Sequence, residues 1–384
     1  MFTRRNDQPG KTKRTLRLVQ LEDRRMLNGA LNLGANPGIV LTNVALGDNE
    51  GLTIADGGMV DLDGDDGPGV AVQTIRLTLA TGTWSAIDPE LGVVNGQMLT
   101  VDASVFANGG QALAAGDVLQ IVGDAQSNSV VLNFDDLDSG DNFDFVPSGG
   151  ISFAGGEGDP EVDSLTLIGY SVNTLTVNHV GLEDGNVVLE GIGTISFSQI
   201  EPLALAGNAV DLVINLPIGA DATVTLSDDG GIADPDATQD AGFSAIDGAF
   251  EFTQFLNPTN SLTINDSNGD GVKIITILGL DAAFDADVTI LEPDAIADNT
   301  VTFAGAIDLN GENLFVEGRT INVEAAVVTG GGNVDLEASQ SVTSTVGGTI
   351  NTQGIIANQA SGSVDIDTLD SSVVGNVNLQ GDII

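Results

Sequence analysis

The sequence contains no cysteine, one histidine, one tryptophan and one tyrosine. Without cysteine the chain has neither disulfide bonds, thiolate metal sites nor a cysteine nucleophile. His179 is alone, so a histidine-based metal site lacks its second ligand, and a lone histidine on a strand is more often structural than catalytic. Trp84 and Tyr170 are too few to form a stacking platform for sugars or bases. These absences favour a non-catalytic function.

Basic residues are scarce after residue 30. Of the eleven lysines and arginines, eight lie in residues 1–30 and three follow, namely Arg76, Lys273 and Arg319, against 52 of the 55 acidic residues. Nucleic-acid binding by this acidic part is excluded, because neutralising phosphates requires lysine and arginine. Cations and basic surfaces are the favourable charged partners, since they reduce the self-repulsion of the carboxylates.

Long apolar runs are also absent. No segment approaches the roughly 18 apolar residues of a membrane-spanning helix, so we predict no membrane span. Residues 1–30 lack the apolar core of an ordinary secretory signal. We therefore expect this basic segment to be disordered in the absence of a partner.

Glycine and β-branched residues are abundant, and apolar triplets recur at a fixed spacing. The segment "SLTINDSNGDGVKIITI" (261–277) aligns without a gap on "DVTILEPDAIADNTVTF" (287–303), 26 residues later. The recurring triplets are Leu262–Ile264 and Val288–Ile290, Ile275–Ile277 and Val301–Phe303, and one step further Leu314–Val316. A fixed spacing of this length predicts one structural coil per repeat.

The C-terminal part keeps the pattern with other spacings. "GNVDL" (332–336), "GSVDI" (362–366) and "GNVNL" (375–379) alternate apolar and polar residues, as half-buried strands do. Each strand buries two or three side chains at about 1.5–3 kcal/mol apiece, so it needs stacked neighbours. Only two short segments, 104–117 and 280–287, have a composition that suits a helix.

We predict an all-β fold. Residues 120–384 are expected to form a β-solenoid, and among solenoids a right-handed parallel β-helix, with tandem β-sandwiches as the alternative. Residues 31–119 are expected to form a less regular β-rich N-terminal domain or cap. Residues 1–30 form a separate basic segment.

Two stretches carry resemblances. "LRLVQLEDRRMLNGA" (16–30) resembles the short N-terminal element of large acidic surface proteins of planctomycete bacteria, with Met26 where leucine is common. The tail with "GGGNVDLEA" and "GGTINTQG" is similar to filamentous-haemagglutinin-type adhesin repeats. The first resemblance implies that residues 1–30 are an export or targeting segment and that the protein is extracellular or at the cell surface. Both imply architecture more than activity.

Two acidic turns are candidate calcium sites. Asp266, Asn268 and Asp270 follow the order D-x-N-x-D-G, but Ile277 stands where a helix-loop-helix calcium site needs its bidentate glutamate. A non-helical calcium turn and a solvated acidic turn both remain open. The denser cluster in "DLDGDDGPG" consists of Asp61, Asp63, Asp65 and Asp66. No cofactor is required, and calcium is the one ion that these residues suggest.

Together these features predict an exported, non-catalytic surface protein that serves as a structural or adhesive β-solenoid with an acidic, hydrated face. Components of the cell surface or extracellular matrix are the expected partners. The alternatives are a polysaccharide hydrolase that uses paired carboxylates, such as Asp135–Asp136 or Asp228–Asp229, and a calcium-dependent adhesion module. The ending "VNLQGDII" lacks a polar cap, so we expect a C-terminal continuation or a capping partner.

Overall fold

The structure is a computed structural model. It describes residues 30–33, 41–46, 50–60, 72–84, 92–102, 118–135, 146–147, 149–156, 162–218, 222–228, 242–266, 271–292, 299–344, 348–352, 363–368, 378–380 and 382–383. These residues form strands, turns and extended connections, with no helix among them, so the all-β prediction is confirmed for this part of the chain. Within the same ranges no helix could cross a membrane. The predictions for residues 1–29 and 104–117 lie outside them.

The strands are short, with two exceptions. The first half comprises β1 (Ala30–Leu33), β2 (Leu41–Ala45), β3 (Gly51–Val60), β4 (Val72–Leu79), β5 (Gly92–Asn95), β6 (Met98–Asp102), β7 (Leu119–Val122), β8 (Ser129–Asn133), β9 (Ile151–Ala154), β10 (Ser164–His179), β11 (Gly185–Leu189), β12 (Gly193–Ser198), β13 (Leu203–Asn215) and β14 (Ala222–Asp228). The second half comprises β15 (Phe243–Gly248), β16 (Phe250–Leu256), β17 (Ser261–Asn265), β18 (Lys273–Ile277), β19 (Asp287–Leu291), β20 (Thr300–Phe303), β21 (Ile307–Asp308), β22 (Leu314–Val323), β23 (Ala326–Val328), β24 (Val334–Ser344), β25 (Thr349–Asn351), β26 (Ser363–Thr368), β27 (Asn378–Gln380) and β28 (Asp382–Ile383). The longest, β10 and β13, pair with each other in parallel.

Antiparallel pairs dominate among the first six strands. β1 pairs with β2, β3 with β4, and β6 with both β4 and β5. This group is joined to the later strands by parallel pairs, β2 with β7 and β3 with β8. The region that we expected to be β-rich and less regular therefore differs from the rest in strand direction as well as in spacing.

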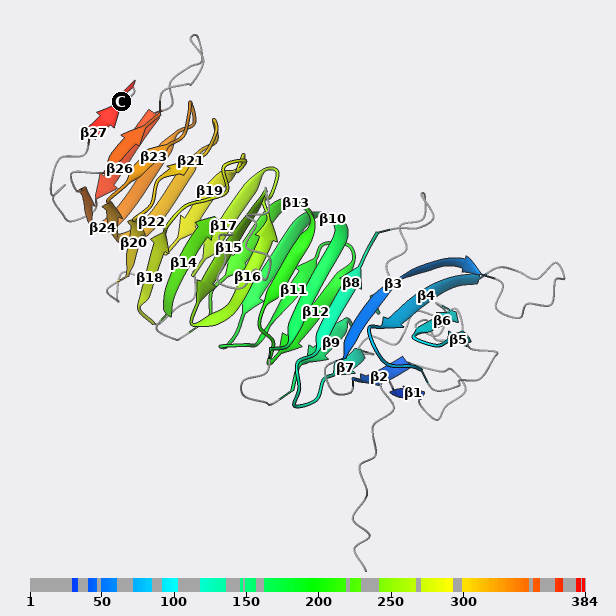
Figure 1. The fold of residues 1–384 in the computed structure, drawn as a ribbon. Coiled ribbons are helices and arrows are strands. Elements are labelled where there is room, and N and C mark those ends of the chain that lie inside the picture. Colours follow the sequence, from blue (N-terminus) through cyan, green and yellow to red (C-terminus); the bar gives the residue numbers. More distant parts are fainter. Residues whose placement is uncertain are drawn as a thin grey trace, which may run out of the picture.

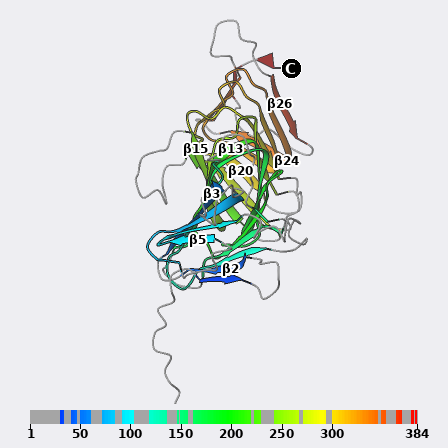
Figure 2. The same ribbon diagram turned by 90° about the vertical axis from the view of Figure 1, so that its right-hand side faces the viewer.

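From β7 onward most neighbours are parallel. One ladder runs from β8 through β10, β13, β17, β19, β22 and β24 to β26, and a second runs from β14 through β18 and β20 to the second half of β22. A small separate sheet joins β21, β23, β25 and β27, again in parallel. Two antiparallel excursions interrupt the order, β10–β11–β12 and β14–β15–β16. In Figures 1 and 2 the strands succeed one another along one long axis, from β2 near one end to β26 near the other.

The parallel register creates columns of buried side chains. Strand alternation turns every second residue inward, and an in-register partner places the same kind of residue above it. One column consists of Leu175, Leu212, Leu262, Val288, Leu314 and Val334, and the next of Val177, Ile214, Ile264, Ile290, Val316 and Leu336. All twelve side chains are almost inaccessible to solvent. These columns form the core that no single strand could supply.

The 26-residue spacing is confirmed as a register. Leu262 pairs with Val288, Ile275 with Val301, and Val288 with Leu314. The spacing then shortens to 20 residues, because Leu314 pairs with Val334 and β22 runs on through a position where earlier coils have a turn.

Two sequence-based expectations are corrected. Residues 280–287 form no helix: the N–H of Phe284 donates to the carbonyl of Asp281 in a turn, and β19 begins at Asp287. The short polar side chain of Asp281 accepts from the N–H of Ala283, which favours the turn. "GNVDL" and "GSVDI" do stack, but the strand within "GNVNL" pairs instead with β25 in the small sheet.

One close approach of strands depends on glycine. β10 has an irregularity between Ile168 and Ser171, where Gly169 adopts a φ of 76°. The ring of Tyr170 lies over β13 at Gly207, and a Cβ atom there would come within 2.4 Å of a ring carbon. Gly207 is therefore needed for Tyr170 to be buried at this point.

The interior columns generate a prediction about stability. Ile290→Ala should lower the free energy of unfolding by about 2–5 kcal/mol, because it removes a fully buried side chain and leaves a cavity between two layers. The control is Thr289→Ala, since Thr289 is the partly exposed neighbour on the opposite face of β19. Urea titration checks this, and equal shifts in the two variants would contradict the inward placement of Ile290.

Candidate functional site

The most unusual side chains in the described part of the chain lie where two neighbouring coils turn. Asp266 follows β17 and Lys273 begins β18, while Glu292 and Asn299 occupy the same places 26 residues later, after β19 and before β20. Strand alternation continues past Ile264 and Ile290, so these four polar side chains point inward. We call them the corner cluster. All four residues are at most 3% exposed.

Contacts within the corner cluster connect the two coils. The Nζ atom of Lys273 lies 3.5 Å from Oδ1 of Asp266. The side-chain amide of Asn299 donates to Oε1 of Glu292, and its oxygen accepts from the backbone N–H of Lys273 at 3.0 Å. A buried ion pair must be matched by further hydrogen bonds to be tolerated. Here the coil above supplies them.

Glu292 carries a proton in this environment. Burial raises the pKa of its carboxyl to about 9, and the negative charge of Asp266 together with a hydrogen bond to that side chain raises it further. The amide of Asn299 and the charge of Lys273 oppose part of this effect on the pKa. At neutral pH the cluster therefore contains one carboxylic acid beside one ion pair.

A second buried group lies at the end of β10. His179 is 3% exposed, its ring centroid lies 4.3 Å from that of Phe250, and Nε2 lies 3.5 Å from the hydroxyl of Thr253. Burial lowers the pKa of His179 to about 3, so its ring is neutral at physiological pH. The single histidine thus occupies a core position, consistent with the structural role that a lone histidine usually has.

Glu251 is a second buried acid. Burial raises the pKa of its carboxyl to about 9, with further increases from the charges of Glu201, Glu183 and Asp247, and a backbone hydrogen bond from Leu203 opposes part of the shift. Desolvation and repulsion between like charges both favour the protonated form. Glu251 is therefore a neutral core side chain despite the acidity of the whole chain.

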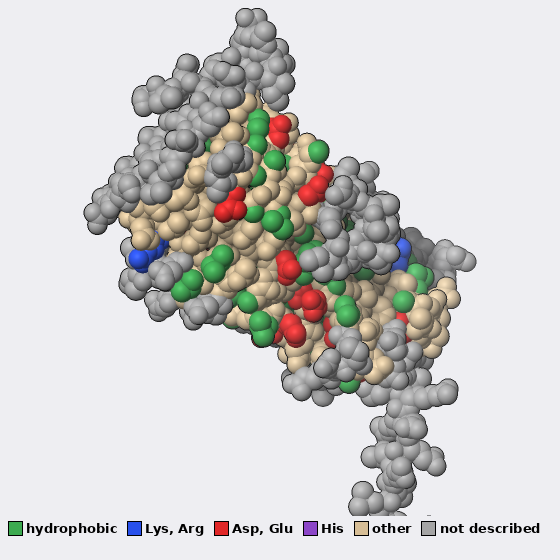
Figure 3. Space-filling view, turned by 60° about the vertical axis from the view of Figure 1, so that its left-hand side comes forward, with side chains coloured by type: hydrophobic (Ala, Val, Ile, Leu, Met, Phe, Trp, Pro, Cys, Tyr) green, Lys and Arg blue, Asp and Glu red, His purple; other side chains and the backbone are tan. Residues whose placement is uncertain are grey.

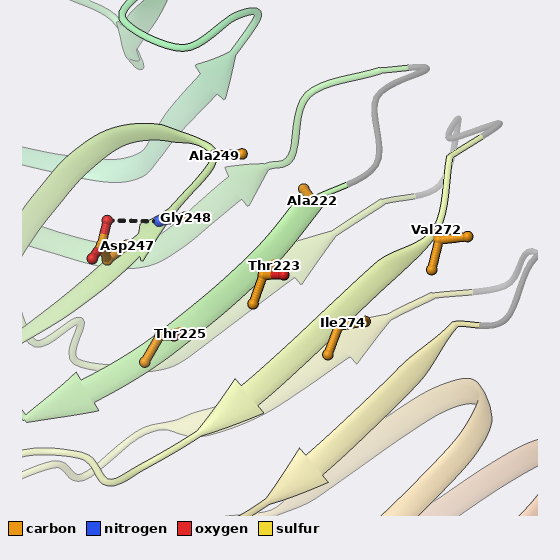
Figure 4. Close-up of a pocket in the computed structure, with 8 residues that line it drawn as sticks. All are labelled: Ala222, Thr223, Thr225, Asp247, Gly248, Ala249, Val272 and Ile274. Carbon is orange, nitrogen blue, oxygen red and sulfur yellow. Dashed lines mark hydrogen bonds between the residues drawn. The ribbon is translucent and has the colours of Figure 1, made fainter.

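The surface also has a shallow hollow between β14, β18 and the turn that joins β15 to β16. Its volume is about 710 Å³, and it is lined by Ala222, Thr223, Thr225, Asp247, Gly248, Ala249, Val272 and Ile274. In Figure 4 these side chains come from neighbouring strands, and Asp247 accepts from the N–H of Gly248. The lining has a single carboxylate. Glycoside hydrolysis ordinarily uses two.

Repeated asparagines line another edge. Asn215 donates to Asn178 at 2.7 Å and accepts from Asn265 at 2.8 Å, and Asn178 donates to Asn186. The parallel register places these amides above one another, so each donates to the next. The ladder ends at Leu291, which takes the place of the next asparagine.

Most of the predicted calcium ligands lie outside the described residues. This holds for Asp61, Asp63, Asp65 and Asp66 in segment 61–71 and for Asn268 and Asp270 in segment 267–270. Asp266 is described, and its carboxylate faces Lys273 in the interior. In the ranges given above, no three acidic or histidine side chains are placed to hold a metal ion. The calcium sites stay predictions.

The sequence reasoning missed the remaining members of the corner cluster. Lys273 was counted only as one of three basic residues of the acidic part, and Glu292 only as the counterpart of Asp266. A usable signal existed, because Lys273 has the same parity as Ile275 and Ile277, and that parity is the buried one. A lysine at an inward position requires a buried counter-charge.

The buried acids generate a prediction about pH. Glu251 keeps its proton in the folded chain up to a pH of about 9, whereas in the unfolded chain it loses the proton near its ordinary pKa of 4.5. Stability should therefore fall as pH rises between those values, by at most about 1.4 kcal/mol per pH unit for each such group. Glu251→Gln should reduce the fall in urea titrations at about pH 5, 7 and 9. The exposed Glu190→Gln is the control and should retain the wild-type fall, and an unchanged fall in Glu251→Gln would refute the assignment.

Comparison with known proteins adds no relative to this description. No protein family matches the chain, and searches of curated proteins and of solved structures find no significant match. The resemblances drawn from residues 16–30 and from the C-terminal repeats therefore stay predictions. What can be said of function rests on the residues and contacts described above.

Proposed function

We propose that the protein is an exported, non-catalytic surface protein whose acidic chain forms an extended β-solenoid with a structural or adhesive role. The observation that carries the proposal is the run of parallel, in-register strands from β8 to β26, which share continuous buried columns. Such a stack holds its ends apart at a fixed distance. Spacing and presentation are therefore the functions that its geometry serves best.

The surface chemistry supports an extracellular location. The part of the chain after residue 30 has 52 acidic and three basic residues, and of the latter Lys273 is buried. Figure 3 shows acidic side chains recurring among hydrophobic ones over one face, with basic ones only near its edges. A surface of this charge repels anionic polymers and attracts cations or basic partners. Basic components of a cell surface or extracellular matrix fit it as partners.

Calcium is a further part of the proposal. The clusters at Asp61–Asp66 and Asp266–Asp270 carry the oxygen ligands that calcium prefers. With Asp266 directed at Lys273, the second site would depend on Asn268, Asp270 and backbone carbonyls. A higher unfolding midpoint in calcium than in chelator would support these sites.

Carbohydrate hydrolysis is the weaker alternative. The hollow beside Asp247 is the described surface feature that could receive a glycan, but its lining contributes one carboxylate where the chemistry ordinarily needs two. A spacer or adhesive rod needs no such pair.

The test of the proposed function is surface labelling of intact producing cells. An antibody raised against the purified chain should label intact cells as strongly as permeabilised ones. Brief trypsin treatment of intact cells should then reduce the label, whereas a cytosolic control protein stays intact. Labelling that appears only after permeabilisation would refute an exported surface protein.

A further inference from the structure

The corner cluster contains the three groups that amide formation between side chains requires. Lys273 supplies an amine, Asp266 supplies a carboxyl group 3.5 Å away, and Glu292 supplies a second carboxyl that is hydrogen-bonded to Asp266. Reacting atoms held at about 3–3.5 Å in a fixed orientation are close to the geometry of attack. All three residues are at most 3% exposed, so bulk water does not compete.

We propose that Lys273 and Asp266 become joined by an intramolecular amide bond, formed by the folded protein itself with Glu292 as the acid and base. The bond links Nζ of Lys273 to Cγ of Asp266. It is a covalent modification within one chain and does not depend on the location of the protein or on its proposed adhesive role.

Burial prepares the ion pair for reaction. An ammonium ion is not a nucleophile and a carboxylate is a poor electrophile, so the proton must first move from Lys273 to Asp266. In water this transfer is strongly unfavourable, but an apolar interior disfavours both charges and brings the neutral pair within reach. Ile264, Ile275, Ile290 and Val301, the nearest inward residues along the four strands, are fully buried and make this interior apolar.

Glu292 is placed to move the protons. Its raised pKa, about 9, means that it holds a proton at neutral pH, and its hydrogen bond to Asp266 places that proton on the electrophile. Asn299 donates to Oε1 of Glu292 and accepts from the backbone of Lys273, which fixes Glu292 relative to the nucleophile. Glu292 is thus the catalytic residue and Asn299 the positioning residue.

The reaction balances without any other reagent. The lone pair of the neutral Lys273 amine attacks Cγ of the protonated Asp266 carboxyl, forming the C–N bond and a tetrahedral intermediate. Glu292 gives its proton to a departing hydroxyl of Asp266 and takes one from Nζ. The C–O bond breaks, one water leaves, and Glu292 has its proton again. Nothing is oxidised or reduced.

The product would close the turn that carries the D-x-N-x-D-G motif. Residues 267–272 would be held in a covalent loop between β17 and β18, at the corner beside the coil of β19 and β20. The loop is short, so the gain from restricting the unfolded chain is small. The larger effect is local, because the two strands can no longer separate at this corner.

Mass spectrometry of the purified full-length wild-type chain tests the proposal. The intact mass should be lower than the sequence mass by that of one water molecule. Lys273 is the only basic residue between Arg76 and Arg319, and an amide-linked lysine is not a trypsin site. Digestion after denaturation should therefore give one fragment spanning residues 77–319, with Asp266 and Lys273 linked in its fragmentation spectrum.

The matched variant is Glu292→Gln, which keeps the size and hydrogen-bonding capacity of the side chain but cannot exchange a carboxyl proton. It should show the full sequence mass and normal cleavage after Lys273, with a wild-type circular dichroism spectrum. If wild-type protein has the full mass and is cleaved after Lys273, the proposal is wrong. Loss of one water with normal cleavage after Lys273, as a cyclic imide at Asp270 would give, or loss of ammonia, which would place the bond at Asn299, also overturns it. A linked Glu292→Gln variant would refute the catalytic role of Glu292.

Discussion

The structure depends on one constraint, the vertical alignment of inward side chains between parallel, in-register strands. Each strand from β17 to β20 contributes only a few apolar residues, and none would be stable alone. Because Ile264, Ile290 and Val316 pair in register, each closes the layer below it. The same constraint allows sequences as different as those of successive coils to share one core, provided that the inward positions match in size and polarity.

The constraint also explains where polar groups become buried. When a strand continues inward past its last apolar residue, the next position of the same parity faces the interior whatever its side chain. At the corner of β17 and β18 these positions hold Asp266 and Lys273, and in the following coil Glu292 and Asn299. One coil thus carries a pair of charges and the next carries groups that are neutral or protonated, so that the two turns depend on each other.

The sequence predicts this fold where successive coils have equal length. The 26-residue spacing from Leu262 to Val288 is visible because both coils have turns of the same size. It is hidden where lengths differ: Leu212 pairs with Leu262 across a 50-residue interval that includes the β15–β16 hairpin, and Leu314 pairs with Val334 after only 20. The contact between Lys273 and Asp266 was missed for another reason, since a lysine beside an acidic turn resembles a solvated charge until the parity of its strand is considered.

The register itself is the central claim, and the absence of native cysteine makes it directly measurable. Thr263 and Thr289 are partners on neighbouring parallel strands, both partly exposed, at a separation that suits a disulfide. The variant Thr263→Cys with Thr289→Cys should form an intramolecular disulfide readily on mild oxidation. The variant Thr263→Cys with Leu291→Cys, displaced by two residues, should remain largely reduced. Equal oxidation of the two variants, or preferential oxidation of the displaced pair, would contradict the in-register stack.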